Sequence, residues 1–197
     1  MKTYYKDNKD AIRAHLDRPI VLIGLMGAGK SRIGRMLAEA LDLPFCDSDD
    51  EVEKAAGMSI PDIFECYGES AFRDGEKKVI RRLIEDGIQV IATGGGAIMS
   101  SETAALIKDR ALSVWIRADI PVILERTART DKRPLLRVDN PEAVLRALAE
   151  KRYPVYAKAD ITVDSGNGEA EDVLNRALKG LADYLSRAEA ERSKDEH

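Results

Sequence analysis

The sequence has little of what small or secreted proteins use to reinforce their cores. Two of its 197 residues are cysteines, Cys46 and Cys66, and two are too few for a disulfide framework or a cysteine-based metal site. A chain of this length buries about 70% of the surface that its unfolded form exposes, so it needs no such reinforcement. We therefore expect one compact domain in a reducing compartment, the cytoplasm.

Long apolar runs and an excess of positive charge are also absent. No apolar run approaches the roughly 20 residues that span a bilayer, and the first eighteen residues lack the apolar core of a secretory signal. The net charge is −4, whereas proteins that bind nucleic acid usually present a basic face. These absences predict a soluble protein that binds neither membranes nor nucleic acid. We expect this acidic, compact chain to be a monomer.

What the sequence does contain is a glycine-rich segment, GLMGAGKS at residues 24–31, directly after the apolar run 19–23. It fits the phosphate-loop pattern G-x-x-x-x-G-K-[ST]. Glycines allow successive backbone N–H groups to turn toward an anion, and the following helix adds its positive end. Lys30 would reach the β- and γ-phosphates, and the hydroxyl of Ser31 would bind Mg²⁺. The alternative is a glycine-rich turn that only joins a buried strand to a helix.

Short apolar segments alternate with helical patterns along the rest of the chain. The predicted strands are residues 20–23, 43–46, 89–92, 112–116 and 161–163. The predicted helices follow the phosphate loop and then cover residues 49–57, 59–67, 68–85, 121–126, 141–153 and 169–185. This alternation predicts an α/β fold, with a parallel sheet covered by helices on both faces.

Polar and glycine residues follow several of these strands. Asp47 and Asp49 come after the second strand, and a triple glycine, Gly94 to Gly96, follows the third. Because right-handed crossovers bring the carboxyl ends of parallel strands to one edge, these residues should meet beside the phosphate loop. A polar segment rich in arginine and proline, residues 127–140, is typical of a mobile lid. The alternatives are helix caps for the aspartates and a flexible turn for the glycines.

Two arginines outside the lid, Arg73 and Arg152, indicate an anionic acceptor. A guanidinium group binds a carboxylate through two parallel hydrogen bonds, which suits a clamp on an organic acid. The alternative for any single arginine is a solvated side chain or a weak surface ion pair.

Six segments together resemble the shikimate kinases. They are GLMGAGKS, DSD at 47–49, FRDGE at 72–76, GGG at 94–96, RPLL at 133–136 and RYPVY at 152–156. Each is weak evidence alone except the first, but their order and spacing are specific and cover the chain from about Ile20 to Val163. The resemblance implies a three-layer α/β sandwich of the P-loop kinase type, with a five-stranded parallel sheet and a mobile lid. It also implies ATP-dependent phosphorylation of the 3-hydroxyl of shikimate, a step of aromatic amino-acid biosynthesis.

The resemblance also implies a role for each matching residue. The ATP-binding residues would be Gly27, Ala28, Gly29, Lys30, Ser31, Arg32, Arg126 and Arg133. Ser31 would bind Mg²⁺ directly, and Asp47 would bind it through water. Shikimate would be held by Asp49, Arg73, Gly95, Gly96 and Arg152. The catalytic residues would be Lys30, Asp49 and Arg133, with Asp49 orienting or deprotonating the hydroxyl.

The sequence also predicts domain boundaries and shows two departures from the family pattern. We expect a polar arm over residues 1–18, either a helical lead-in or a frayed segment. A single kinase domain should cover 19–186, and a charged, fraying tail 187–197. Arg32 replaces a second hydroxyl residue found in many P-loop kinases, and residues 164–168 lack an arginine that some relatives place beside the base. The alternative enzyme is a kinase for another hydroxy acid, such as gluconate. The alternative from another class is a regulator that binds ATP without transferring phosphate.

Overall fold

A central parallel sheet organises the structure, a computed structural model that describes residues 2–128, 140–166 and 168–195. Five strands lie in the order β2-β3-β1-β4-β5, all parallel. Their bounds are β1 Ile20–Ile23, β2 Phe45–Asp47, β3 Val90–Ala92, β4 Leu112–Arg117 and β5 Ile161–Asp164. The predicted α/β class and five-stranded parallel sheet are therefore confirmed.

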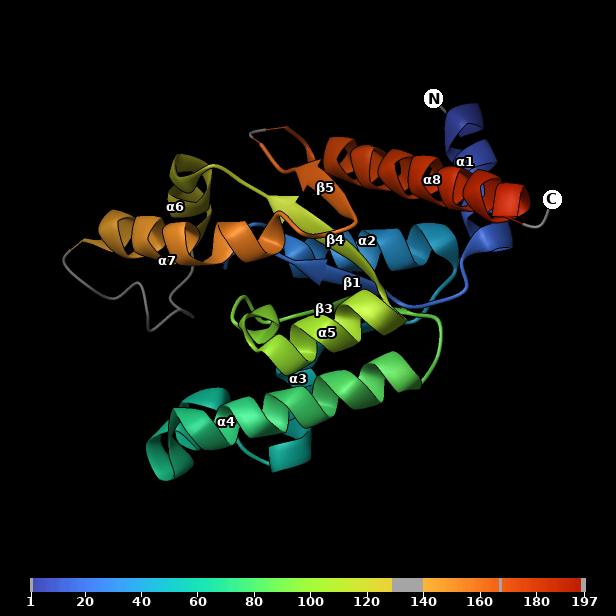
Figure 1. Cartoon of the computed structure of the whole chain (residues 1–197). Helices are drawn as coiled ribbons and strands as arrows, with labels where there is room; N and C mark the ends of the chain where they lie inside the picture. The colour runs from blue at the N-terminus through green and yellow to red at the C-terminus, as the bar shows by residue number, and fades with distance from the viewer. Residues whose placement is uncertain (1, 129–139, 167, 196–197) are drawn as a thin grey trace.

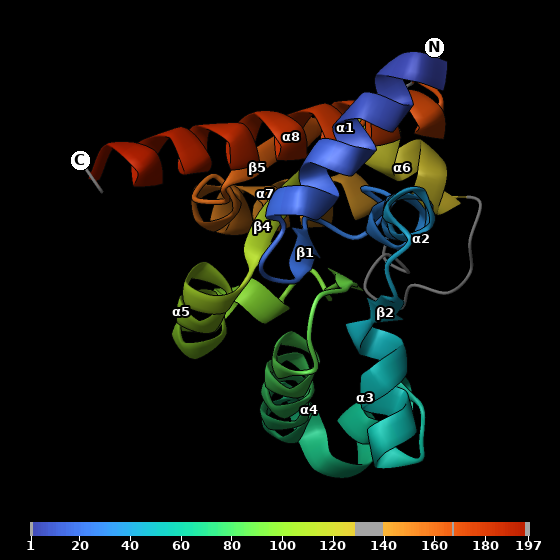
Figure 2. The same ribbon diagram turned by 90° about the vertical axis from the view of Figure 1, so that its right-hand side faces the viewer.

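Helices cover both faces of the sheet (Figures 1 and 2). One layer contains α1 (Lys2–His15), α2 (Lys30–Leu41) and α8 (Ala170–Asp195), with α1 packed on the other two. α5 (Ser101–Arg110) lies on the other face, packed against α4 (Ile60–Glu85). α3 (Ser48–Ala56) follows β2 and pairs with α4, while α6 (Ile120–Ala128) packs on α7 (Pro141–Tyr156). A short 3₁₀ helix, η1 (Ala97–Met99), follows the triple glycine.

The core lies where the sheet is covered on both sides. All four residues of β1 are buried, as the continuous apolar run of a central parallel strand requires. β4 is buried as far as Ile116 and exposes only Arg117. β5 alternates buried and exposed residues, as expected at a sheet edge. No helix within the described ranges is long and apolar enough to span a membrane.

Several elements differ from the sequence-based expectation. The two predicted helices before Asp86 form one element, α4, which is interrupted at Gly68, where φ is 79°. The sequence reasoning missed α5, whose Ser100 accepts a hydrogen bond from the Thr103 N–H as an N-cap. α7 continues three residues beyond the predicted end to Tyr156, with Pro154 inside its last turn.

At the two ends of the described chain, the first segment takes the helical form of its two expected forms, and the last segment is more ordered than expected. α1 is a helix with Ile12 fully buried in the core. The tail from Arg187, which was expected to fray, is instead the last part of α8 and is helical as far as Asp195. Arg192 on this extension pairs with Asp17 at 3.2 Å. These contacts explain the extra order, and they join segments too distant in sequence for local patterns to reveal.

We predict that Gly24→Ala destabilises the protein far more than Gly57→Ala. Both glycines have positive φ, 144° and 68°, which costs a non-glycine residue about 1–2 kcal/mol. At Gly24 a Cβ would also lie 2.5 Å from the Ile116 carbonyl oxygen, whereas at Gly57 it would meet nothing within 4 Å. Denaturant unfolding should therefore show a further loss of about 1–3 kcal/mol in Gly24→Ala. Equal losses in the two variants would contradict the packing at Gly24.

Candidate active site

The phosphate loop joins β1 to α2 and has the backbone that its glycines predict. Gly24, Gly27 and Gly29 all have positive φ, and Gly29 is the N-cap of α2. The ammonium group of Lys30 donates hydrogen bonds to the carbonyls of Gly24 and Leu25, at 2.9 and 3.0 Å. The loop therefore wraps around its own lysine at the positive end of a helix, which is the arrangement of an anion site.

A hydroxyl and two acidic residues meet beside this loop. The Ser31 hydroxyl donates to Asp47 Oδ2 at 2.6 Å. The other oxygen of Asp47 accepts from the backbone N–H of Asp49 at 3.1 Å and so caps α3. The capping role that the sequence left open for Asp47 is therefore present, and it leaves the carboxylate next to the serine hydroxyl.

The triple glycine after β3 brings the charged residues together. An added Cβ on Gly94 would lie 2.8 Å from Asp49 Oδ1 and 2.9 Å from Glu76 Oε1. Real Cβ atoms do not come this close to other heavy atoms, so only glycine allows both carboxylates to reach this part of the chain. The Gly94 N–H also donates to the Ser48 hydroxyl at 3.2 Å.

The two predicted clamp arginines lie against the next two glycines. A Cβ on Gly95 would be 3.1 Å from Arg152 Nη1, and one on Gly96 would be 2.9 Å from both terminal nitrogens of Arg73. The guanidinium groups thus come from α4 and α7, more than seventy residues apart in sequence, to one turn. The structure brings together every predicted acceptor-binding residue: Asp49, Arg73, Gly95, Gly96 and Arg152.

The sequence reasoning missed the buried partner of Arg73. Arg73 Nη1 donates to Glu76 Oε2 at 2.8 Å, and Glu76 is 2% exposed. Exposed Glu69 contacts the same guanidinium group at 3.3 Å. The other oxygen of Glu76 is buried without a hydrogen-bond partner among the described residues. The spacing of three residues between Arg73 and Glu76 on a helix was the signal that could have revealed this pair.

Burial and neighbouring charges perturb the two carboxyl groups at Gly94. Burial, followed by the charges of Asp47 and Glu76, raises the pKa of Asp49 to about 6, although Lys30 opposes the shift. Burial likewise raises the pKa of Glu76, and the hydrogen bond from Arg73 and the charge of Arg152 oppose it. Such shifts, caused by burial together with neighbouring charges, are typical of catalytic sites.

Arg126 lies on the other side of the phosphate loop. Its guanidinium donates to the Ala28 carbonyl at 3.2 Å, the Ser165 hydroxyl at 3.0 Å and the Gly166 carbonyl at 2.8 Å. It therefore joins the phosphate loop to the segment after β5. A cavity of about 150 Å³ opens here. Its lining is Gly29, Arg32, Ile33, Arg126, Ser165, Gly168, Ala170 and Val173.

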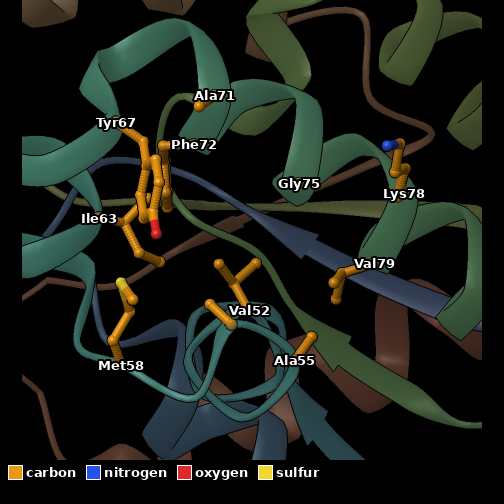
Figure 3. A pocket seen from close by; sticks show the side chains of 11 residues that line it. Val52, Ala55, Met58, Ile63, Tyr67, Ala71, Phe72, Gly75, Lys78 and Val79 are labelled. Carbon is orange, nitrogen blue, oxygen red and sulfur yellow. The ribbon is translucent and has the colours of Figure 1, made fainter.

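A larger cavity of about 420 Å³ lies between α3 and α4 (Figure 3). It is lined mainly by carbon, with Met58, Ile63, Tyr67 and Phe72 around one end and Lys78 beside the other. It offers few hydrogen-bonding groups for a hydroxylated acid. The turn at residues 94–96 remains the better acceptor site, since neither Asp49 nor the two arginines line this cavity.

The predicted lid cannot be placed. Arg133, proposed as a catalytic and ATP-binding residue, and most of the segment 127–140 lie outside the described residues. The ends that are described are the last two residues of α6 and Asn140, whose side chain accepts a hydrogen bond from the Ala143 N–H as the N-cap of α7.

Comparisons with known proteins identify the family. A family model described as shikimate kinase matches residues 26–182. The chain belongs to the shikimate kinase family. A shikimate kinase from Rhodopseudomonas palustris is 50% identical over 87% of this chain and 85% of its own length. One from Caulobacter vibrioides is 54% identical over 76% of this chain and 75% of its own length.

Solved structures agree with this membership. A shikimate kinase from Acinetobacter baumannii, in complex with shikimate, is 40% identical and superimposes with a TM-score of 0.80 over 86% of this chain and 95% of its own. A gluconokinase from Sinorhizobium meliloti has a TM-score of 0.64 at 19% identity, over 90% of this chain and 98% of its own. At that identity the likeness shows only a shared fold.

We predict that Asp49→Asn stabilises this shikimate kinase family member at pH 8 but not at pH 4. A carboxyl group with a raised pKa holds its proton more tightly in the folded protein than in the unfolded chain. Its ionisation therefore destabilises the folded state as the pH rises from about 4 to above 6. Removing that charge should increase the free energy of unfolding at pH 8 by about 1–3 kcal/mol.

Denaturant unfolding at the two pH values measures this difference. Asp50, exposed in the same helical turn, provides the matched control. Asp50→Asn should stabilise the protein far less at pH 8, because the charge of this exposed residue is only a minor cause of the shift at Asp49. A loss of stability in Asp49→Asn at pH 8 would contradict the electrostatic strain assigned to Asp49.

Proposed function

We propose that this protein transfers the γ-phosphoryl group of ATP to the 3-hydroxyl of shikimate, in aromatic amino-acid biosynthesis. The observation that carries the proposal is the glycine turn at residues 94–96, where the half-buried carboxylate of Asp49 and two guanidinium groups converge beside the phosphate loop. Relatives about 50% identical to this chain, named shikimate kinases, support the same activity. So does the 40% identical structure in complex with shikimate.

The nucleotide would occupy the phosphate loop and the smaller cavity. Residues 27–32 would surround the phosphates, and Arg126 and Arg32 would line the space for the nucleoside. Mg²⁺ typically binds to one or two protein side chains and completes its shell with water and phosphate oxygens. Ser31 and Asp47, 2.6 Å apart, fit that requirement. When bound, the ion neutralises charge on the phosphates.

The acceptor would bind on the glycine turn. Arg73 and Arg152 would hold the carboxylate of the acid, and the backbone of Gly95 and Gly96 would lie against its ring. Asp49 would contact the hydroxyl that reacts. Lys30 interacts electrostatically with Asp49, so the acceptor would be held directly beside the phosphate loop.

This arrangement suits phosphoryl transfer. The transition state is loose and its charge lies on the equatorial oxygens, so catalysis consists mainly of positioning and charge stabilisation. Lys30 supplies positive charge on the nucleotide side, and we assign the same role to Arg133. Asp49 is ionised above about pH 6 and can then orient the hydroxyl or accept its proton. Below that pH it carries its own proton and does neither well.

The two alternatives require different sites. A gluconate kinase would need a surface for a longer, open-chain polyol. A regulator that binds ATP without transferring phosphate would need neither a carboxylate beside the phosphate loop nor an arginine pair on a shared turn. The sites of Asp49, Arg73 and Arg152 therefore argue against the regulator. An arginine pair would suit either acid, and the relatives about 50% identical to this chain, which are named shikimate kinases, favour shikimate.

An ADP-release assay with several acceptors tests the function. With Mg²⁺ and ATP, we expect turnover with shikimate and at most background ADP release with gluconate or nucleoside monophosphates. Turnover confined to gluconate would overturn the choice of acceptor. Binding of ATP with no turnover of any acceptor would support the regulator.

Substitution of a clamp arginine tests the acceptor site. Hydrogen bonds to charged groups contribute about 1.5–3 kcal/mol, so Arg73→Ala should raise the KM for shikimate by about 10- to 100-fold and leave the KM for ATP nearly unchanged. Arg81 lies on the same helix, exposed and paired with Glu102, so Arg81→Ala is the matched control and should change neither constant. Equal effects of Arg73→Ala on both substrates would remove Arg73 from the acceptor clamp.

A further inference from the structure

The last turn of α7 carries a tyrosine that none of the roles assigned above uses. Tyr156 has no exposed surface, and its hydroxyl donates a hydrogen bond to the backbone carbonyl of Gly95. Burial raises the pKa of this hydroxyl to about 12, so it remains a neutral donor across the physiological range. A buried side chain from one helix thus reaches the middle residue of the acceptor-binding turn.

Tyr156 and Arg152 belong to the same face of α7. They are four residues apart in one helix, a spacing that places side chains one above the other. Arg152 lies 3.1 Å from the Cβ position of the same glycine, and its charge acts on the Tyr156 hydroxyl. The helix therefore contacts Gly95 at two points, once through a guanidinium group and once through a phenol.

An aromatic cluster fixes the position of the Tyr156 ring. The ring centroids of Trp115 and Tyr156 are 5.9 Å apart, and those of Trp115 and Tyr153 are 5.1 Å apart. The Tyr153 hydroxyl donates to the Ala118 carbonyl at 3.1 Å, away from the glycine turn. Trp115 on β4 lies 3.6 Å from the Cβ position of Gly24 at the start of the phosphate loop. These contacts leave the Tyr156 ring little freedom to turn.

The hydrogen bond to Gly95 also orients its neighbour. The Gly95 carbonyl and the Gly96 N–H belong to one planar trans peptide, in which the two groups point in opposite directions. Holding the carbonyl toward Tyr156 therefore turns the Gly96 N–H to the opposite side. Arg73 lies against Gly96. The orientation of this peptide therefore affects the positions of the turn and of the guanidinium groups relative to a bound acid.

We propose that Tyr156 is a positioning residue for the acceptor: its hydroxyl fixes the Gly95–Gly96 peptide relative to Arg152 and Arg73. This inference rests on the proposed function. It assigns Tyr156 no contact with substrate and no part in the phosphoryl transfer itself. Its loss should weaken acceptor binding selectively and leave nucleotide binding intact.

Tyr156→Phe removes only the hydroxyl, and Tyr153→Phe is its matched control. Both variants lose one hydrogen bond to a backbone carbonyl within the same aromatic cluster, and Tyr156→Phe also loses the side-chain hydrogen bond with Arg152. A net hydrogen-bond contribution of about 1 kcal/mol predicts that Tyr156→Phe raises the KM for shikimate about 3- to 10-fold, with kcat and the KM for ATP within twofold of the unchanged protein. Tyr153→Phe should leave all three constants within twofold.

A second measurement does not depend on turnover. In ¹⁵N-labelled protein the amide resonance of Gly96 should shift in Tyr156→Phe and stay in place in Tyr153→Phe. Unaffected KM for shikimate and an unmoved Gly96 resonance in Tyr156→Phe would overturn the inference while the proposed function stands. Equal changes in both variants would also overturn it, since they would reflect a general loosening of the cluster. No turnover of shikimate by the unchanged protein would overturn both proposals.

Discussion

The acceptor half of the site depends on the absence of side chains at residues 94–96. Because these three residues lack a Cβ, two carboxylates and two guanidinium groups lie within 2.8–3.1 Å of the positions that Cβ atoms would take. The parallel register of β3 with β1, Leu22 opposite Ala92, places this turn directly beside the phosphate loop. The glycine turn thus sets the spacing between the phosphate loop and the acceptor site, and side chains from α3, α4 and α7 pack against it.

The carboxylates of Asp49 and Glu76 at this turn lower the stability of the folded protein. Asp49 and Glu76 are both buried enough for their pKa values to rise, so their ionised forms are less favourable there than in water. The charges of Arg73 and Arg152 offset part of the rise in the pKa of Glu76, and the charge of Lys30 offsets part of the rise in the pKa of Asp49. Functional sites often retain such unfavourable charges, since a more stable arrangement would lose the chemistry.

The sequence predicted the family, the α/β class and the five-stranded parallel sheet, and all three are confirmed. The phosphate loop could be read locally because its glycines, lysine and serine act within eight residues. Parallel strands then placed Asp49 and the glycine turn at one edge without any knowledge of tertiary contacts. The roles of individual site residues, the domain boundaries and the lid with Arg133 stay predictions.

What the sequence did not reveal depends on contacts between distant segments. Glu76 acquires its importance only when Gly94 packs against it, and Tyr156 only when α7 continues past Pro154 to reach Gly95. The order in α8 beyond Arg187 likewise depends on its packing with α1. Propensity and periodicity describe a segment by itself, so they cannot report which buried partner it will meet.

The aromatic cluster of Trp115, Tyr153 and Tyr156 has a spectroscopic consequence. Trp115 is the single tryptophan of the sequence, and it is 5% exposed between the first residue of the phosphate loop and two tyrosines of α7. The intrinsic fluorescence of the protein, excited at the red edge of the indole band, therefore comes from one fluorophore at the junction of the nucleotide and acceptor halves. Its emission reports on this junction without any added label.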